Sequence, residues 1–142
     1  MKTEEKYKKI YLYCDGASRG NPGPAAIAYL IKDEADNILQ QESKRIDKCT
    51  NNAAEYKAII EGLRACQDFN PAEVIVCSDS QLAINQINKR WRINIENLKE
   101  LYLEVKKIEQ LFIKGTIIYI QKPRSNKNLR AADKLANMAL DS

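Results

Sequence analysis

Two short apolar runs, each ending in an aspartate, constrain the fold of this 142-residue chain more than any other feature of its sequence. The run KKIYLYCD spans residues 8–15 and alternates aliphatic residues with tyrosines, which predicts a strand that is apolar on both faces. The run EVIVCSD spans residues 73–79 and is typical of a buried parallel strand. Because ligands commonly bind at the carboxyl ends of such strands, we expect Asp15 and Asp79 to lie close together at one edge of a sheet.

The rest of the chain predicts a mixed sheet with helices packed on it. The run GASRGNPGP at residues 16–24 is predicted to be turn, and the two strands after it form an antiparallel meander with the first. These strands are expected at residues 25–33 and 37–46, a fifth strand at 115–122, and helices at about 52–68, 81–90, 98–112 and 129–140, with a break at 91–94. This order places the chain in the α/β class as a single domain over residues 1–142.

The composition of the chain limits which binding partners and which cellular compartment it can have. Charged residues make up 30% of the chain and the formal net charge is +4, a mild excess that favours a polyanionic partner without requiring one. The four cysteines are widely spaced and the chain contains no histidine, which argues against a zinc site and favours reduced, structural thiols. The N-terminal segment MKTEEKYKKI is polar, so we expect no secretory signal, no membrane span and a cytoplasmic location.

Two more acids lie on the apolar sides of predicted helices. Glu55 precedes Ile59 by four residues and Asp133 follows Leu129 by four, so both are expected to point towards the sheet. Any one acid alone is more simply a cap, a turn residue or a salt-bridge partner. Four carboxylates in one partly buried place are costly, because their charges repel and desolvation penalises each ionised group. The ion that offsets this cost is expected to be Mg²⁺ or Mn²⁺, and two ions about 4 Å apart suit displacement at a phosphodiester.

Four segments of the chain resemble, in order and spacing, the signature segments of type 1 ribonuclease H. They are YCDGASRGNPGPAAIAY, TNNAAEYKAIIEGL, VCSDSQLAINQI and AADKLANMAL, and they span nearly the whole chain. The resemblance implies the ribonuclease H fold, a five-stranded mixed sheet flanked by helices, in agreement with the order of elements above. It also implies an endoribonuclease that hydrolyses the RNA strand of RNA–DNA hybrids and leaves 3′-hydroxyl and 5′-phosphate ends.

The resemblance assigns the four acids to one catalytic, metal-binding set. Asp15 would bridge two Mg²⁺ ions, for which Mn²⁺ can substitute. Asp133 would complete the site of the ion that activates the attacking water. Glu55 and Asp79 would complete the site of the ion that stabilises the leaving oxygen.

The resemblance also assigns the residues that bind the substrate. The positions that follow the RNA strand and touch its 2′-hydroxyls are Gly16, Ala17, Ser18, Asn21, Asn51 and Gln81. A 2′-hydroxyl separates RNA from DNA, and amides can both donate to it and accept from it. Thr50 and Asn52 match a pocket for a phosphate of the DNA strand, although from residue type alone they are first of all helix-capping residues. Trp91 matches an aromatic surface for DNA sugars, and packing of a helix end is the equal alternative.

Three features depart from the family pattern. The loop QKPRSNKNLRAAD lacks the histidine that many bacterial relatives use there to help product leave, and Lys122, Arg124 or Lys127 is expected to substitute in part. No basic helical protrusion follows the DSQ helix, which predicts weaker binding of the hybrid. GPAA replaces the more usual GPGG, a change that adds two methyl groups in a strand. We also expect no separate hybrid-binding domain, because the first strand begins close to Met1.

Two other functions stay open at this point. A resolvase- or integrase-like nuclease of the same superfamily would carry similar acids but cut DNA, and DGxxxGNPGP together with TNN argues against it. A non-catalytic hybrid-binding module would keep the groove without turnover, and the missing histidine is its only support. We expect a monomer, because the sequence shows neither coiled-coil heptads nor a long apolar edge strand.

Overall fold

The computed structural model describes residues 7–112 and 115–142. Within these residues every predicted strand and helix is present, with ends that differ by a few residues. In chain order they are β1 (Tyr7–Ser18), β2 (Gly23–Asp33), β3 (Ile38–Cys49), α1 (Asn51–Cys66), the 3-10 helix η1 (Gln67–Phe69), β4 (Pro71–Ser78), α2 (Gln81–Ile87), α3 (Glu96–Glu109), β5 (Thr116–Gln121) and α4 (Lys127–Asp141). Most of the polar N-terminal segment, residues 1–6, lies outside the described part. In that part, no helix has the length and apolar character that crossing a bilayer requires.

The strands form one mixed sheet in the order β3-β2-β1-β4-β5. The β1–β2 and β2–β3 pairs are antiparallel, which confirms the predicted meander, whereas the β1–β4 and β4–β5 pairs are parallel. Tyr13 of β1 lies opposite Cys77 of β4. Asp15 and Asp79 each follow this pair by two residues, so the register brings both acids to the same edge and the same face of the sheet.

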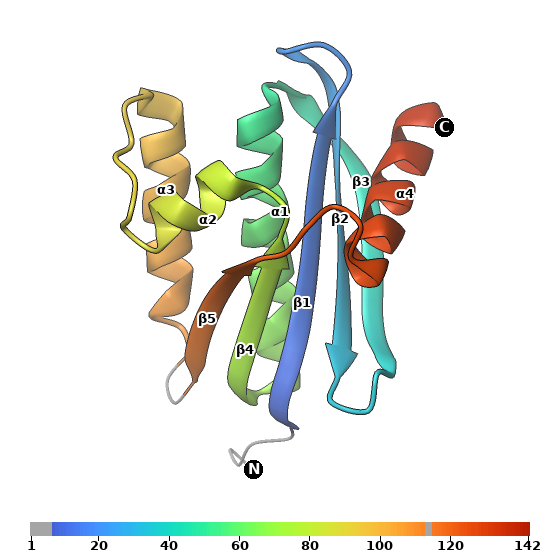
Figure 1. Cartoon of the computed structure of the whole chain (residues 1–142), viewed down its shortest axis with the longest axis vertical. Helices are drawn as coiled ribbons and strands as arrows, with labels where there is room; N and C mark the ends of the chain where they lie inside the picture. Colours follow the sequence, from blue (N-terminus) through green and yellow to red (C-terminus); the bar gives the residue numbers. More distant parts are fainter. Residues whose placement is uncertain (1–6, 113–114) are drawn as a thin grey trace.

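Helices cover both faces of the sheet (Figure 1). α1 and α3 lie on one face, and α4 packs on the other face across β1, β2 and β3. The larger core lies between the sheet and α1, and Tyr56 and Leu12 are fully buried in it. Beneath α4 the buried cluster consists only of Ala28, Ala132 and Ala136 among the described residues. Small side chains allow a short distance between helix and sheet, so α4 brings its polar residues near the end of β1.

The run at residues 16–24 is not all turn, contrary to the sequence prediction. β1 continues to Ser18 and β2 starts at Gly23, so only residues 19–22 lie outside the strands. Gly16 explains the difference, because a Cβ at this position would lie 2.3 Å from the backbone carbonyl carbon of Ala54 in α1. This glycine allows a strand and a helix to pack closely and does not form a turn.

Three helices end earlier than predicted, and one of them is α3, which stops at Glu109 and not at residue 112. α2 stops at Ile87, short of residue 90, because Lys89 adopts a left-handed backbone conformation with φ of 64°. Asn88, at the end of α2, donates its side-chain amide to the carbonyl oxygen of Tyr119 in β5 over 3.1 Å. α1 ends at Cys66 and continues as the short 3-10 helix η1. The predicted break at residues 91–94 is confirmed, since α3 begins at Glu96.

Candidate active site

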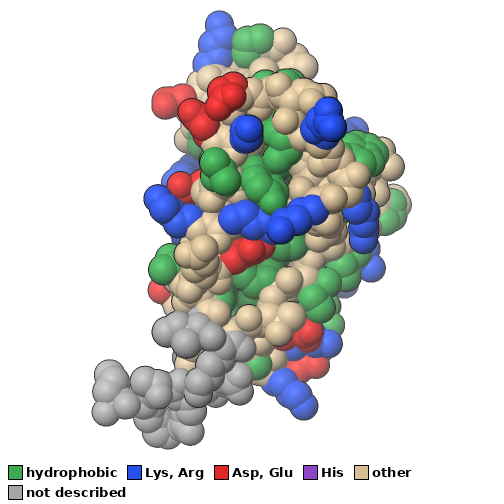
Figure 2. Space-filling view, turned by 90° about the vertical axis from the view of Figure 1, so that its left-hand side faces the viewer, with side chains coloured by type: hydrophobic (Ala, Val, Ile, Leu, Met, Phe, Trp, Pro, Cys, Tyr) green, Lys and Arg blue, Asp and Glu red, His purple; other side chains and the backbone are tan. Residues whose placement is uncertain are grey.

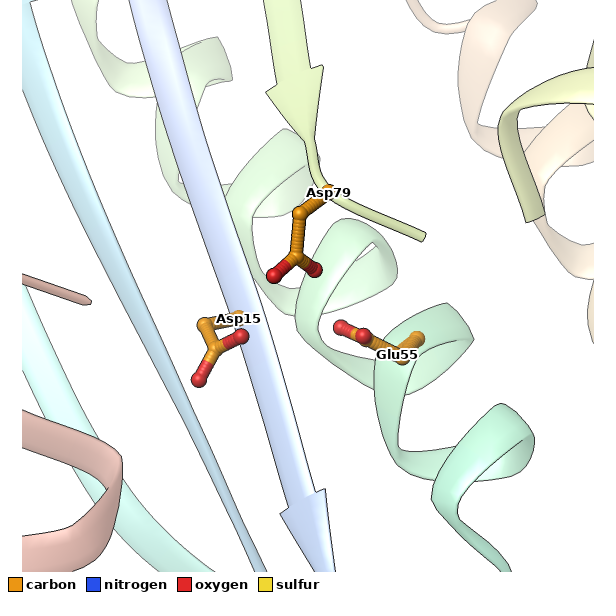
Figure 3. A group of neighbouring side chains, drawn as sticks. All are labelled: Asp15, Glu55 and Asp79. Atoms are coloured by element: carbon orange, nitrogen blue, oxygen red, sulfur yellow. The ribbon is translucent and has the colours of Figure 1, made fainter. Parts of the chain in front are cut away.

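Three acidic side chains from different elements converge at the carboxyl ends of β1 and β4 (Figure 3). Asp15 comes from β1, Asp79 directly follows β4, and Glu55 comes from α1. One carboxylate oxygen of each residue lies within 4.8 Å of the corresponding oxygens of the other two. The structure therefore brings three of the four acids that the sequence singled out into one group, and the fourth, Asp133, contacts Asp15.

Asp15 is buried without a full set of partners. The residue is 6% exposed, and its Oδ2 is the only buried side-chain oxygen or nitrogen in residues 7–112 and 115–142 that lacks a hydrogen-bond partner. Burial raises the pKa of Asp15 from 3.8 to about 8, and the negative charges of Asp79 and Asp133 add to the increase. A buried oxygen without a donor is rare in folded proteins and indicates that a ligand completes this place.

Glu55 is held against the sheet by the start of α1. The hydroxyl of Thr50 caps this helix by accepting a hydrogen bond from the N–H of Ala53 over 3.2 Å. The N–H of Gly16 donates to Oε1 of Glu55 over 2.9 Å in buried surroundings. Burial raises the pKa of Glu55 well above its usual value, and the charges of Asp15 and Asp79 raise it further, while the Gly16 hydrogen bond acts in the opposite direction. The expectation that Glu55 points towards the sheet is confirmed.

Asp79 pairs with a cation from the loop before α4. Nε of Arg124 lies 3.3 Å from Oδ2 of Asp79, and the Arg124 side chain is 86% exposed. Lys127 was another proposed substitute for the missing histidine. Its Nζ lies 3.5 Å from Oδ2 of Asp36 and not beside the acidic cluster. Lys122 directly follows β5, and its backbone N–H extends the pairing with β4 by donating to the carbonyl oxygen of Ser78. Of these three cations, Arg124 is the one whose side chain pairs with an acid of the cluster.

Asp133 differs from the sequence prediction because it is exposed. The buried residues of α4 are Leu129, Ala132, Ala136 and Leu140. Asp133 follows Leu129 by four residues, which overshoots a full helical turn by about 40° and places it beside the buried stripe. It is not one of the three acids whose oxygens lie within 4.8 Å of one another. Its side chain nevertheless points towards the sheet as predicted, because it lies within hydrogen-bonding reach of Asp15 on β1, and both this contact and its charge raise the pKa of Asp15.

The three converging acids fit a hard divalent cation. Carboxylate oxygens are the ligands that Mg²⁺ and Mn²⁺ prefer, and neither a thiolate nor an imidazole belongs to this group. A cation between the carboxylates would give Oδ2 of Asp15 its missing partner. It would also lower the two pKa values that burial raises, because it favours the ionised forms.

The residues predicted to follow the RNA strand lie around the acidic cluster. Residues 16–18 form the end of β1 beyond the first acid. Asn21, in the turn between β1 and β2, accepts through Oδ1 a hydrogen bond from the backbone N–H of Asn51 over 3.0 Å. Gln81 is exposed at the start of α2, close after the acid that follows β4. The contacts of these residues with 2′-hydroxyls stay a prediction.

Thr50 caps a helix and also lines a surface hollow. The hollow has a volume of about 440 Å³, and its lining includes Thr50, Lys48 and Lys57, but not Asn52. Neither lysine was predicted from the sequence. Lys57 follows Thr50 by seven residues, two helical turns along the same face, and this spacing could have revealed it. A phosphate in this hollow would meet two cations and a hydroxyl, with the acid Glu100 also in the lining.

Trp91 is 45% exposed in the segment between α2 and α3. It borders a hollow of about 300 Å³ together with Lys89, Lys99 and Tyr102. An exposed indole beside lysines is typical of surfaces that bind nucleic acid. The assignment of Trp91 to the DNA strand stays a prediction.

Comparisons with known proteins agree with this arrangement. The family described as reverse transcriptase-like matches residues 13–139. Ribonuclease HI of Halobacterium salinarum is 34% identical over 133 residues, which cover 94% of this chain and 65% of that protein. The crystal structure of RNase H1 from the same organism has a TM-score of 0.88, with 94% of this chain and 98% of that chain covered. The chain belongs to the type 1 ribonuclease H family.

Two further proteins are similar to this chain over most of its length. LC11-RNase H1, crystallised in complex with RNA/DNA hybrid, is 38% identical with a TM-score of 0.86, covering 93% of this chain and 96% of that chain. The bifunctional protein Rv2228c of Mycobacterium tuberculosis is 35% identical over 135 residues. This ribonuclease H chain spans 36% of the length of Rv2228c, as against 65% of the halobacterial protein. The fold expected from the sequence is confirmed by these superpositions.

Proposed function

We propose that this chain is an endoribonuclease that hydrolyses the RNA strand of RNA–DNA hybrids and leaves 3′-hydroxyl and 5′-phosphate ends. The observation that carries the proposal is the unpartnered, buried oxygen of Asp15, which lies beside Glu55 and Asp79 at the edge of a ribonuclease H sheet. Such a cluster needs a cationic ligand to offset repulsion between its charges. The relative LC11-RNase H1, with the same fold, is known in complex with an RNA/DNA hybrid, which supports the choice of substrate.

We propose that the acids hold two Mg²⁺ ions, with Mn²⁺ as a substitute. Asp15 would supply oxygen to both, Glu55 and Asp79 would complete one site, and Asp133 would complete the other. Ions bound there lower the pKa of an attacking water and offset the charge that develops on the phosphate.

The protein's own contribution is to hold the carboxylates in place before the substrate arrives. β1 is a central strand and fixes Asp15, while the N–H of Gly16 holds Glu55 by a 2.9 Å hydrogen bond. Burial of Asp15 and Glu55 keeps bulk water out and strengthens their interactions with any charge in the site. Arg124 is exposed beside Asp79, so its guanidinium can transfer from that carboxylate to a phosphate oxygen of the substrate.

The amides around the acids are proposed to select the RNA strand. The end of β1 at residues 16–18, together with Asn21, Asn51 and Gln81, would contact 2′-hydroxyls. Thr50 and Asn52, with Lys48 and Lys57 beside Thr50, would hold a phosphate of the DNA strand, and Trp91 would contact its sugars. A deoxyribose at the selected positions would leave the amides without partners, which disfavours it.

Cleavage of a hybrid labelled on its RNA strand tests the proposed function. We expect cutting with Mg²⁺ or Mn²⁺, none in EDTA and none of an all-DNA duplex, with cutting restored by a patch of about four ribonucleotides. Cleavage of the all-DNA duplex would favour the resolvase alternative. Tight hybrid binding without any cleavage would identify the non-catalytic module.

Amide variants of the acids test the site itself. Asp15→Asn and Asp79→Asn keep the side-chain shape but remove the charge that holds an ion, so we expect cleavage to be lost and hybrid binding to persist. Asp68→Asn changes an exposed acid on η1 and is the matched control. Activity of Asp15→Asn within about tenfold of wild type, a barrier change of only about 1.4 kcal/mol, would overturn the assignment.

We further propose that the protein is a monomer in the cytoplasm. All four cysteines are free, and Cys14, Cys66 and Cys77 are buried, as expected of thiols in a reducing compartment. Light scattering coupled to size-exclusion chromatography tests the oligomeric state.

A further inference from the structure

A chain of polar contacts connects the turn between β1 and β2 with Asp133 on α4. Nδ2 of Asn137 donates to Oδ1 of Asp133 over 3.2 Å and to the carbonyl oxygen of Asp133 over 3.0 Å. Nη2 of Arg19 lies 3.5 Å from Oδ1 of Asn137 and 3.4 Å from its carbonyl oxygen. The same nitrogen lies 2.7 Å from Oδ1 of Asp141, one helical turn after Asn137.

Arg19 determines which way the Asn137 amide points. A guanidinium can only donate hydrogen bonds, so the oxygen of the amide must face Arg19. The amide nitrogen then faces Asp133, and its two hydrogens match the two Asp133 oxygens in reach. The ion pair with Asp141 keeps the Arg19 guanidinium beside the Asn137 amide oxygen, which fixes the orientation of the amide.

Asp133 is the acid of the proposed site that most needs such support. Asp15 and Glu55 are fixed by burial, and Glu55 also by the Gly16 N–H. Asp133 is exposed at the margin of α4, so its rotamer depends on polar contacts more than on packing. The amide of Asn137 engages Oδ1, and the Asp133 side chain also lies within hydrogen-bonding reach of Asp15, so the carboxylate is held at the acidic cluster.

We propose that Asn137 and Arg19 are positioning residues that preset the Asp133 carboxylate for a divalent ion. The inference rests on the proposed role of Asp133 in metal binding. The turn at residues 19–22 also holds the start of α1, through the Asn21–Asn51 hydrogen bond. One short turn thereby ties the helix of Glu55 and the helix of Asp133 to the same end of β1.

The test measures ion binding in the absence of nucleic acid. Isothermal titration calorimetry with Mn²⁺ is carried out on the wild type, Asn137→Ala, Arg19→Ala and the double variant. Because loss of a hydrogen bond to a metal-binding residue typically weakens ion affinity, we expect Asn137→Ala to bind Mn²⁺ about three- to tenfold more weakly. Arg19→Ala should cause no further loss in the Asn137→Ala background, since Arg19 acts through Asn137.

Two controls separate positioning from stability. Met138→Ala changes an exposed neighbour on the same helix and should leave Mn²⁺ affinity unchanged. Alanine also has a higher helix propensity than asparagine, so the melting temperature of Asn137→Ala should not fall. In cleavage assays, Asn137→Ala should show a lower kcat at limiting Mn²⁺, recovery at high Mn²⁺, and an unchanged KM for the hybrid.

Three results would overturn the inference. Wild-type affinity in Asn137→Ala would show that the amide does not act on the ion. Tighter binding would show that Asn137 holds Asp133 away from it. Additive losses for the two variants would show that Arg19 acts independently. If the wild type neither binds Mn²⁺ nor cleaves a hybrid, the proposed function fails as well, whereas wild-type cleavage beside an unaffected Asn137→Ala rejects this inference alone.

Discussion

The ionised forms of Asp15 and Glu55 weaken the fold when no cation is bound. Burial raises the pKa of both carboxyls, that of Asp15 to about 8, whereas an aspartate in an unfolded chain titrates at about 3.9. The native state therefore holds a proton on Asp15 that the unfolded chain has already released. The stability that Asp15 contributes is complete below pH ~4 and is lost as pH rises through about 8.

We predict that the metal-free protein loses stability between pH 5 and pH 8 and that Asp15→Asn reduces this loss. At pH 8 the variant should be more stable than the wild type by about 1–3 kcal/mol, because its amide carries no charge that burial and the neighbouring acids would penalise. Urea denaturation in EDTA at both pH values measures the difference. Saturating Mg²⁺ should stabilise the wild type at pH 8, because ion binding and proton release are coupled, but not the variant. The same pH dependence for both proteins would contradict the raised pKa.

Arg124 is the residue from which we expect an effect on turnover. Its guanidinium is mobile enough to leave Asp79, since the side chain is 86% exposed. We predict that Arg124→Ala lowers kcat about tenfold, a barrier increase of about 1.4 kcal/mol, with little change in KM for the hybrid. Lys127→Ala removes a cation that pairs with Asp36 and is the control, with near wild-type kcat expected. Steady-state kinetics that showed equal effects for both variants would assign Arg124 no special role.

The packing of β1 against α1 is the contact between elements that sets the site. Gly16 lies directly beyond Asp15 in β1, and its N–H reaches Glu55 because the two backbones approach closely. A Cβ on Gly16 would lie 2.3 Å from backbone atoms of Ala54, and backbone cannot rotate away as a side chain can. The same short contact therefore positions both acids.

We predict that Gly16→Ala lowers the free energy of unfolding by about 3 kcal/mol or more, because α1 must shift away from the sheet. Gly115→Ala is the matched control, since the nearest atom to a Cβ there lies at 3.4 Å, and its cost should stay within about 1 kcal/mol. Chemical denaturation measures both. Cleavage by Gly16→Ala should fall even where the variant remains folded, because Glu55 moves with its helix. Full activity in a folded Gly16→Ala protein would contradict this coupling.

At the scale of the whole molecule the net positive charge is modest. The net charge is +4, and Figure 2 shows lysine and arginine side chains scattered among acidic and apolar ones on the face it displays. Each of the two hollows is lined by only two lysines. These are Lys48 and Lys57 beside Thr50, and Lys89 and Lys99 beside Trp91. Residues 88–95 connect α2 to α3 without a basic helical insertion. We therefore expect hybrid binding to rest on a small number of phosphate contacts.

We predict a shallow salt dependence of hybrid binding. Each neutralised phosphate lowers log K by about 0.9 per decade of salt, and we expect a slope that corresponds to about three to five phosphates. Binding of a hybrid to Asp15→Asn at several salt concentrations measures this slope without cleavage. A lysine-rich helix grafted between Arg90 and Asn94 should steepen it. A native slope that corresponds to roughly ten phosphates would place the hybrid on a different surface.

Local pattern in the sequence by itself determined the elements, the mixed sheet and the convergence of Asp15 with Asp79. Alternation and helical spacing report which side of an element is apolar, and such signals lie within a few residues. They sufficed for Glu55, which is buried as expected. For Asp133 they predicted the side that faces the sheet, since its side chain reaches Asp15, but not its exposure, because a spacing of four cannot distinguish the centre of a buried stripe from its margin.

Only the tertiary structure decided features that depend on distances between segments remote in sequence. Gly16 looked like a turn residue, yet Ala54 on another element requires it to be glycine. Arg124 was one of three possible cations until the loop placed it 3.3 Å from Asp79. Arg19 and Asn137 are 118 residues apart, and no local pattern relates them. Packing of α4 on the sheet brings them together, because contacts of this kind follow from the arrangement of whole elements and not from the residues beside them in the chain.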